Sequence, residues 1–139
     1  MLGTNQDRNT SIGLLILRVG VAALLFFPHG WPKLANFAAS SQTFADPIGL
    51  GSTTSLSLVV FAEVVCAVLV GFGFLTRLAC VPIIIFMLVA VFLQLAADPF
   101  SKKELAIVYG IASVALFCAG PGRYSFDGLI GGLWRSKGA

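Results

Sequence analysis

Two ionisable side chains, Arg18 and Glu63, lie inside long apolar stretches of the sequence, where a charge is expensive to hold. In a membrane-spanning helix such a residue costs roughly 2.5–3.5 kcal/mol unless it is paired or hydrated, so it is a candidate for function. A long arginine side chain can extend its charge to the membrane surface. A carboxylate about 10 Å below that surface, the depth that 1.5 Å per residue gives for Glu63, cannot. Glu63 is therefore predicted to be protonated or to contact a cationic or hydrated partner.

Polar side chains on the other apolar stretches favour a shared site. At 100° per residue, Arg18 and His29 fall on one face of the first stretch. Gln94 and Tyr109 are the polar residues on the faces expected to point inward from the third and fourth stretches. In depth Glu63 falls between His29 and Arg18, so a buried ion pair with Arg18 is predicted and His29 is the alternative partner. The candidate ligand-binding residues are His29, Glu63, Gln94 and Tyr109.

Three of these residues, but not Glu63, also have a purely structural interpretation. Arg18 would extend to the membrane surface, His29 would lie at the interface, and Tyr109 would belong to the aromatic belt. The single histidine argues against a metal site, and no nucleotide-binding glycine motif is present. The three cysteines form no CxxC pair and are interpreted as small buried side chains. No catalytic residue, metal or intrinsic cofactor is assigned.

The composition indicates a membrane protein. Of the 139 residues, 58% are hydrophobic and 11% are charged, whereas a soluble domain averages about 45–50% apolar and about 25% charged residues. The net charge of +3 is small, and the basic residues are scattered along the chain. These features exclude a soluble enzyme domain, a disordered chain and a nucleic-acid binder, and they predict contact with a lipid bilayer.

The elements that must position the site are apolar segments of about 20 residues, the length of a membrane-spanning helix. Thr76 and Arg77 alone separate the second segment from the third, which requires an antiparallel hairpin. We therefore predict an all-α, integral membrane, antiparallel four-helix bundle in a single domain, 1–139. A short helix at 126–134 is expected at the membrane interface. The four predicted spans are about 12–31, 56–75, 78–97 and 104–120.

An even number of spans places both termini on the same side of the membrane. Five basic residues lie on that side and three on the other, which favours cytoplasmic termini by the positive-inside rule. A cleaved signal peptide is the alternative for the first span, but this stretch is long and contains Arg18. The five basic residues on the side of the termini are Arg8, Arg77, Arg123, Arg135 and Lys137, and the three on the opposite side are Lys33, Lys102 and Lys103.

Three segments together resemble the DoxX family of small four-helix membrane proteins. They are 14–34, which contains Phe-Pro-His-Gly-Trp-Pro-Lys-Leu; 62–77, which contains Ala-Glu and ends in Gly-Phe-Leu-Thr-Arg; and 120–127, Gly-Pro-Gly-Arg-Tyr-Ser-Phe-Asp. The resemblance covers nearly the whole chain and implies a bacterial inner-membrane protein. The positions that match the family are Arg18, His29, Lys33, Glu63, Arg77 and Arg123.

Two functions follow from the resemblance. The family takes its name from a subunit of a thiosulfate:quinone oxidoreductase, and related proteins are linked with redox systems. The first hypothesis is a membrane subunit of a quinone-linked oxidoreductase, in which the candidate residues bind a quinone and a partner protein supplies electrons. The second is a non-catalytic membrane scaffold or assembly factor, in which Arg18 and Glu63 fix helix packing. A protein partner or a homo-oligomer is expected in either case.

Overall fold

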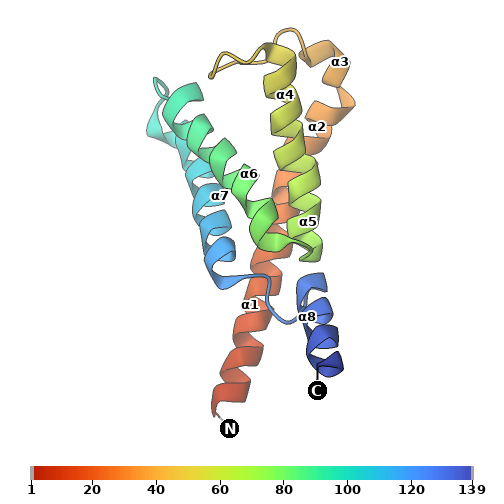
Figure 1. Ribbon diagram of the computed structural model, residues 1–139. Coiled ribbons are helices and arrows are strands. Elements are labelled where there is room, and N and C mark those ends of the chain that lie inside the picture. The colour runs from red at the N-terminus through yellow and green to blue at the C-terminus, as the bar shows by residue number, and fades with distance from the viewer. Residues whose placement is uncertain (1, 139) are drawn as a thin grey trace.

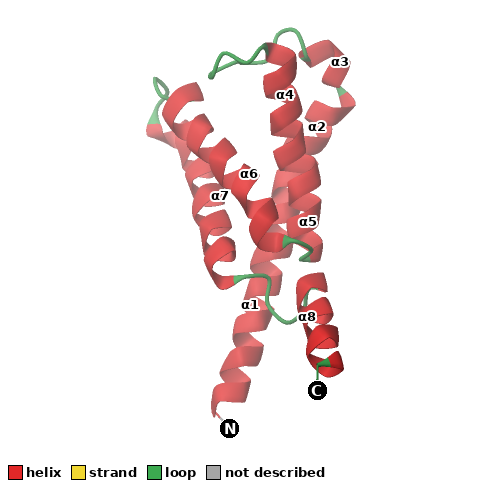
Figure 2. Ribbon diagram, viewed as in Figure 1, coloured by secondary structure: helices red, strands yellow, loops and turns green. Residues whose placement is uncertain are grey.

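The computed structural model describes residues 2–138, which form helices and loops without a strand (Figures 1 and 2). Met1 and Ala139, the end residues of the expected domain 1–139, lie outside the described part. Four helical rods pack side by side, and a short helix follows them. The first rod is α1 (Leu2–Leu25), η1 (Phe26–Gly30) and α2 (Trp31–Ala35), followed by α3 (Phe37–Ser40); the second is α4 (Ser52–Val60), η2 (Phe61–Cys66) and α5 (Ala67–Phe72); the third is α6 (Thr76–Val89) and η3 (Ala90–Gln94); the fourth is α7 (Phe100–Ala119); the last helix is α8 (Phe126–Lys137).

Three rods are long and apolar enough to cross a membrane: Asn5–Ala35, Ser52–Phe72 and Thr76–Gln94. This confirms the expected class, an all-α membrane protein. The fourth rod, α7, has 20 residues, but three charged residues, Lys102 to Glu104, lie in its first five positions, so its apolar part is shorter. A fourth crossing, and with it the complete four-helix membrane bundle, stays a prediction.

The rods pack most extensively in two pairs, α6 against α7 and α1 against α5. Both chain termini and the α5–α6 turn lie at one end of the bundle, which we call the terminal end; the loop 41–51 and the α6–α7 connection lie at the other, the loop end (Figure 1). The second and third rods meet at the terminal end and diverge toward the loop end (Figure 1). Fully buried aliphatic side chains fill the centre: Leu25, Leu56, Val70, Ile83 and Leu116.

The α5–α6 turn is closed by backbone geometry and by the C-terminal segment. Gly73, with φ of 72°, ends α5 in a left-handed conformation that suits glycine. Its N–H and that of Phe74 bond back to carbonyls of α5. The Asp127 carboxylate then accepts the N–H groups of Leu75 at 2.9 Å and Thr76 at 3.0 Å, which caps the N-terminus of α6. A side chain from α8 thus completes the first turn of α6.

Arg18 lies in the same region, which we call the terminal junction (Arg18, Gly73, Thr76, Tyr124 and Asp127). Its side chain is 1% exposed and donates a hydrogen bond to the carbonyl of Tyr124. A Cβ added at Gly73 would collide with the guanidinium. Arg18 is therefore fully buried against the segment that leads into α8, which argues against the alternative interpretation that it extends to the membrane surface.

The loop 41–51 is held in place by Asp46. Its carboxylate accepts the Ser55 hydroxyl at 2.8 Å and the N–H groups of Leu50 and Gly51 at 2.9 and 2.7 Å. The hydrogen bond from Ser55, followed by that from the Gly51 N–H, holds the pKa of Asp46 below its ordinary value. The loop therefore has a defined conformation over the start of α4.

Two sequence expectations need adjustment at the ends of elements. The first rod continues past Trp31 to Ala35, and Pro32 lies in the first turn of α2, directly after the π-helical turn η1. The expected C-terminal helix is present as α8, capped by Ser125 and without a buried residue. Its place at the membrane interface stays a prediction.

The cysteines follow the sequence interpretation in part. Cys66 and Cys80 are buried as expected, but Cys118 is exposed.

Candidate functional site

One cleft toward the loop end brings together all four candidate ligand-binding residues, His29, Glu63, Gln94 and Tyr109. Each comes from a different rod. The cleft has a volume of about 200 Å³, and its apolar walls include Leu25, Phe86 and Met87. Phe26 and Val91, two apolar residues on the first and third rods, do not line it. We call this site the polar cleft; its polar lining is His29, Lys33, Glu63, Gln94, Lys102 and Tyr109.

Three of these side chains lie on π-helical turns. His29 is in η1, Glu63 is in η2 and Gln94 is in η3. The i→i+5 bonds include Trp31 N–H to the Phe26 carbonyl and Leu95 N–H to the Ala90 carbonyl. A π-helical turn is rare and often occurs at functional sites, because its extra residue changes the direction in which the following side chains point. Three such turns at one cleft indicate that the local geometry serves the site.

Proline explains the position of Tyr109. Pro28 has no N–H to donate to the carbonyl of Leu24, four residues earlier, so that carbonyl lacks its α-helical partner. The hydroxyl of Tyr109, on α7, donates to this carbonyl at 3.4 Å. Its ring meets the imidazole of His29 edge to face, with centroids 6.0 Å apart. The hydroxyl of Tyr109 thus takes the place of the N–H that Pro28 lacks, and this contact between α1 and α7 orients Tyr109 and His29 in the cleft.

Glu63 is paired, but not with the residue expected. Its carboxylate is 2.5 Å from the ammonium of Lys33. The predicted pair of Arg18 with Glu63 is not formed, and the His29 alternative is not formed either. Arg18 lies three turns closer to the terminal end, about 16 Å from His29 at 1.5 Å per residue, and is held there by Tyr124. The sequence predicts three alternatives for Glu63, a proton, a cationic partner or a hydrated one, and the structure places the cation Lys33 beside it.

Lys33 and Lys102 are cleft residues that the sequence reasoning missed. The predicted first span ends at about Trp31, which places Lys33 in the loop that follows. A signal was available: Lys33 follows His29 by four residues, so the face that carries Arg18 and His29 continues through it. Lys102 is exposed at the start of α7, where it also pairs with Asp98 at 3.4 Å. No single-sequence signal indicated its place at the cleft.

A glycine lets the first and second rods approach at the level of the cleft. A Cβ at Gly30 would lie 2.6 Å from the carbonyl oxygen of Glu63 and 2.9 Å from a methyl of Val64. Gly30→Ala should therefore lower the free energy of unfolding by about 1–3 kcal/mol, because backbone atoms have to move. The measurement is the melting temperature of the detergent-solubilised protein.

Gly20→Ala is the matched control. It lies on the same rod, and a Cβ there meets no atom within 4 Å. Alanine has the higher helix propensity, so this variant should melt at the wild-type temperature or slightly above it. Equal melting temperatures for the two variants would contradict the close contact between η1 and η2.

The fold and the cleft define a small all-helical membrane protein with a partly buried ion pair and a polar site between its rods. The chain belongs to the DoxX family, whose model matches residues 13–95. It is also similar to a protein of Escherichia coli (strain K12) named "Inner membrane protein YqjF", with 30% identity over 129 residues, 88% of this chain and 95% of the relative. No solved structure matches the chain.

Proposed function

We propose that this DoxX-family protein binds the head group of a quinone in the polar cleft and serves as the membrane subunit of a quinone-linked redox system. The observation that carries the proposal is the convergence of donors and acceptors from four rods on one cleft with apolar walls. Polar side chains inside a membrane are expensive, so their gathering at one place favours a site over chance.

The chemistry of a quinone matches the lining. Each of its two carbonyl oxygens needs a hydrogen-bond donor, and His29, Gln94 and Tyr109 can donate. Full reduction of a quinone takes up two electrons and two protons. The pair of Glu63 with Lys33 offers a group that can hold and pass a proton at the cleft. The electrons come from a partner protein in this proposal.

We place the protein in a bacterial inner membrane with both termini in the cytoplasm. The name of the Escherichia coli relative supports the location. The distribution of basic residues supports the orientation, and Lys33 no longer counts against it because it pairs with Glu63 inside the first rod. The terminal end carries Arg8, Arg77, Arg123, Arg135 and Lys137, and the loop end carries Lys102 and Lys103.

The test is quinone affinity in folded variants of the polar cleft. His29→Ala and Glu63→Gln should each weaken the binding of a soluble short-chain quinone about tenfold, the effect of losing one good polar contact. Glu104→Gln is the control, because Glu104 is exposed and lies outside the cleft lining. Circular dichroism confirms that each variant is folded.

A scaffold without catalytic activity is the second candidate. It is favoured by two buried contacts that fix packing without any ligand: Lys33 with Glu63, and Arg18 with the Tyr124 carbonyl. Under this hypothesis the wild type has no measurable affinity for a quinone, or His29→Ala and Glu63→Gln bind it as the wild type does. Either result would replace the redox proposal with the scaffold.

A further inference from the structure

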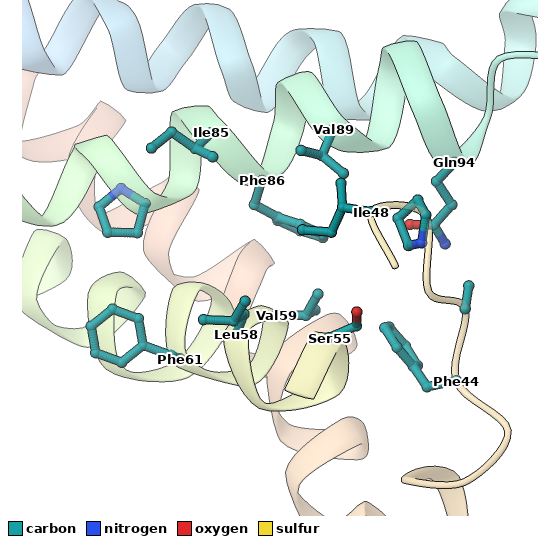
Figure 3. A pocket seen from close by; sticks show the side chains of 13 residues that line it. Phe44, Ile48, Ser55, Leu58, Val59, Phe61, Ile85, Phe86, Val89 and Gln94 are labelled. Carbon is teal, nitrogen blue, oxygen red and sulfur yellow. The ribbon is translucent and has the colours of Figure 1, made fainter. Parts of the chain in front are cut away.

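An apolar groove lies beside the polar cleft, between α4 and η2 on one side and α6 on the other. Its volume is about 320 Å³. In Figure 3, Leu58 and Val59 face Ile85 and Val89 across it, and Phe44 of the loop stands at one end. Its lining from Pro82 to Gln94 runs about 18 Å along the third rod at 1.5 Å per residue.

The groove and the polar cleft share a wall. Phe86 and Gln94 line both. The groove has only two polar side chains, Ser55 and Gln94, and the Ser55 hydroxyl is engaged with Asp46. No residue of the described part of the chain hydrogen-bonds the Gln94 amide, which stands where the two spaces meet. The polar cleft and the apolar groove therefore meet at the side-chain amide of Gln94.

A second apolar furrow, between α6 and α7, includes Leu88 and Ile111 and also adjoins the cleft, through Met87 and Ala106. The two differ in their walls. All the residues that line the furrow belong to the third and fourth rods, so these two rods are its only walls in the described part of the chain. The groove has the loop residues Phe44, Pro47 and Ile48 as a third wall, in the loop that Asp46 holds in place. A groove with three walls can surround the apolar chain of a ligand more completely than the furrow can.

We propose that the groove holds the apolar prenyl chain of the quinone whose head group occupies the polar cleft, and that this ligand enters sideways from the bilayer between α4 and α6. The inference rests on the proposed function and names its substrate class, a long-chain membrane quinone. Side chains on the rims are open to lipid, with Leu58 50% and Ile85 56% exposed. Gln94, which lines both spaces, lies where the quinone head group joins its prenyl chain.

The experiment uses the full-length protein in phosphatidylcholine nanodiscs and two probes with the same head group, one with a long prenyl chain and one without. Ile85→Trp fills the groove, and Leu88→Trp, 52% exposed in the wild type, places the same side chain in the α6–α7 furrow. Affinities are compared between variants for each probe, which cancels partition into the bilayer. Ile85→Trp should weaken the long-chain probe about fivefold through lost chain contacts and leave the chainless probe unchanged. Leu88→Trp should change neither.

A long-chain probe with a diazirine at the far end of its chain gives the location directly. Photolabelling should mark the groove segments 55–61 and 82–89, and Ile85→Trp should remove this label. If the chainless probe binds but Ile85→Trp leaves the long-chain affinity unchanged, or if the label falls on Ile111, the groove assignment is wrong and the head site stands. If neither probe binds the wild type, the proposed function fails and the inference fails with it.

Discussion

Replacing Lys33 with alanine is expected to lower the free energy of unfolding by about 3–5 kcal/mol, the usual effect of breaking a buried ion pair from one side. The reason is that Glu63, 3% exposed, would keep its carboxylate in the interior with no cation beside it. Glu63→Ala should destabilise less, because the Lys33 side chain is 27% exposed and can turn its ammonium outward. The measurement is unfolding of the detergent-solubilised protein by heat or denaturant.

Lys102→Ala is the matched control for Lys33→Ala. It also removes a lysine of the cleft lining, but its pair with Asp98 is exposed and should contribute no more than about 1 kcal/mol. The double variant Lys33→Met with Glu63→Leu should recover most of the stability, because no unpaired charge remains. A Lys33→Ala protein as stable as Lys102→Ala would show that the pair does not hold the first and second rods together.

Replacing Arg18 with alanine is expected to cost about 2–5 kcal/mol, the range for truncating a large buried side chain. The side chain is 1% exposed, and its loss also leaves the Tyr124 carbonyl without a donor. The segment 120–127 should then separate from the bundle, and α6 should lose the Asp127 cap with it. Faster trypsin cleavage after Arg123 would report this separation, besides the lower melting temperature.

Two variants separate the contributions of Arg18. Arg18→Met keeps most of the volume, so it should melt above Arg18→Ala, yet it still lacks the donor to Tyr124 and should be cleaved faster than the wild type. Arg8→Ala, an exposed position on the same helix, should behave as the wild type. An Arg18→Ala protein that trypsin cleaves at the wild-type rate would contradict the anchoring of the C-terminal segment by Arg18.

The sequence predicted the all-helical membrane class because apolar length is a strong constraint in a bilayer, where every backbone group must be bonded within its own helix. It also predicted which side chains line the cleft. His29, Glu63, Gln94 and Tyr109 are too polar for lipid, which favours positions that face the other rods, and their depth follows from the rise per residue. Glu63 and Tyr109 are buried, whereas Gln94 is exposed at the end of the third rod. Depth along the rod is a property that a single helix fixes by itself.

Pairing between rods could not be predicted in the same way. The partner of Glu63 depended on where the first helix ends, and two prolines, Pro28 and Pro32, lie close to that end. A π-helical turn accommodates Pro28 and the first turn of α2 accommodates Pro32, so the helix reaches Lys33. The extra residue of each π-helical turn also shifts the helical face beyond it, which a constant 100° per residue does not describe. The conformation of the loop 41–51, and therefore the third wall of the groove, depends on the hydrogen bonds of Asp46. No sequence pattern indicates which groups Asp46 binds.

The cap on α6 has a consequence for the order in which the chain matures. Asp127 is 52 residues beyond Leu75, whose N–H it accepts, and a ribosome adding roughly 5–20 residues per second needs about 3–10 s to make that stretch. During this interval α5 and α6 exist as a hairpin, but the first N–H groups of α6 face water and Arg18 has no Tyr124 carbonyl to bind. The terminal junction can close only when nearly the whole chain has been made. The C-terminal segment therefore finishes assembly, and a nascent chain that lacks it is an open form of the same bundle.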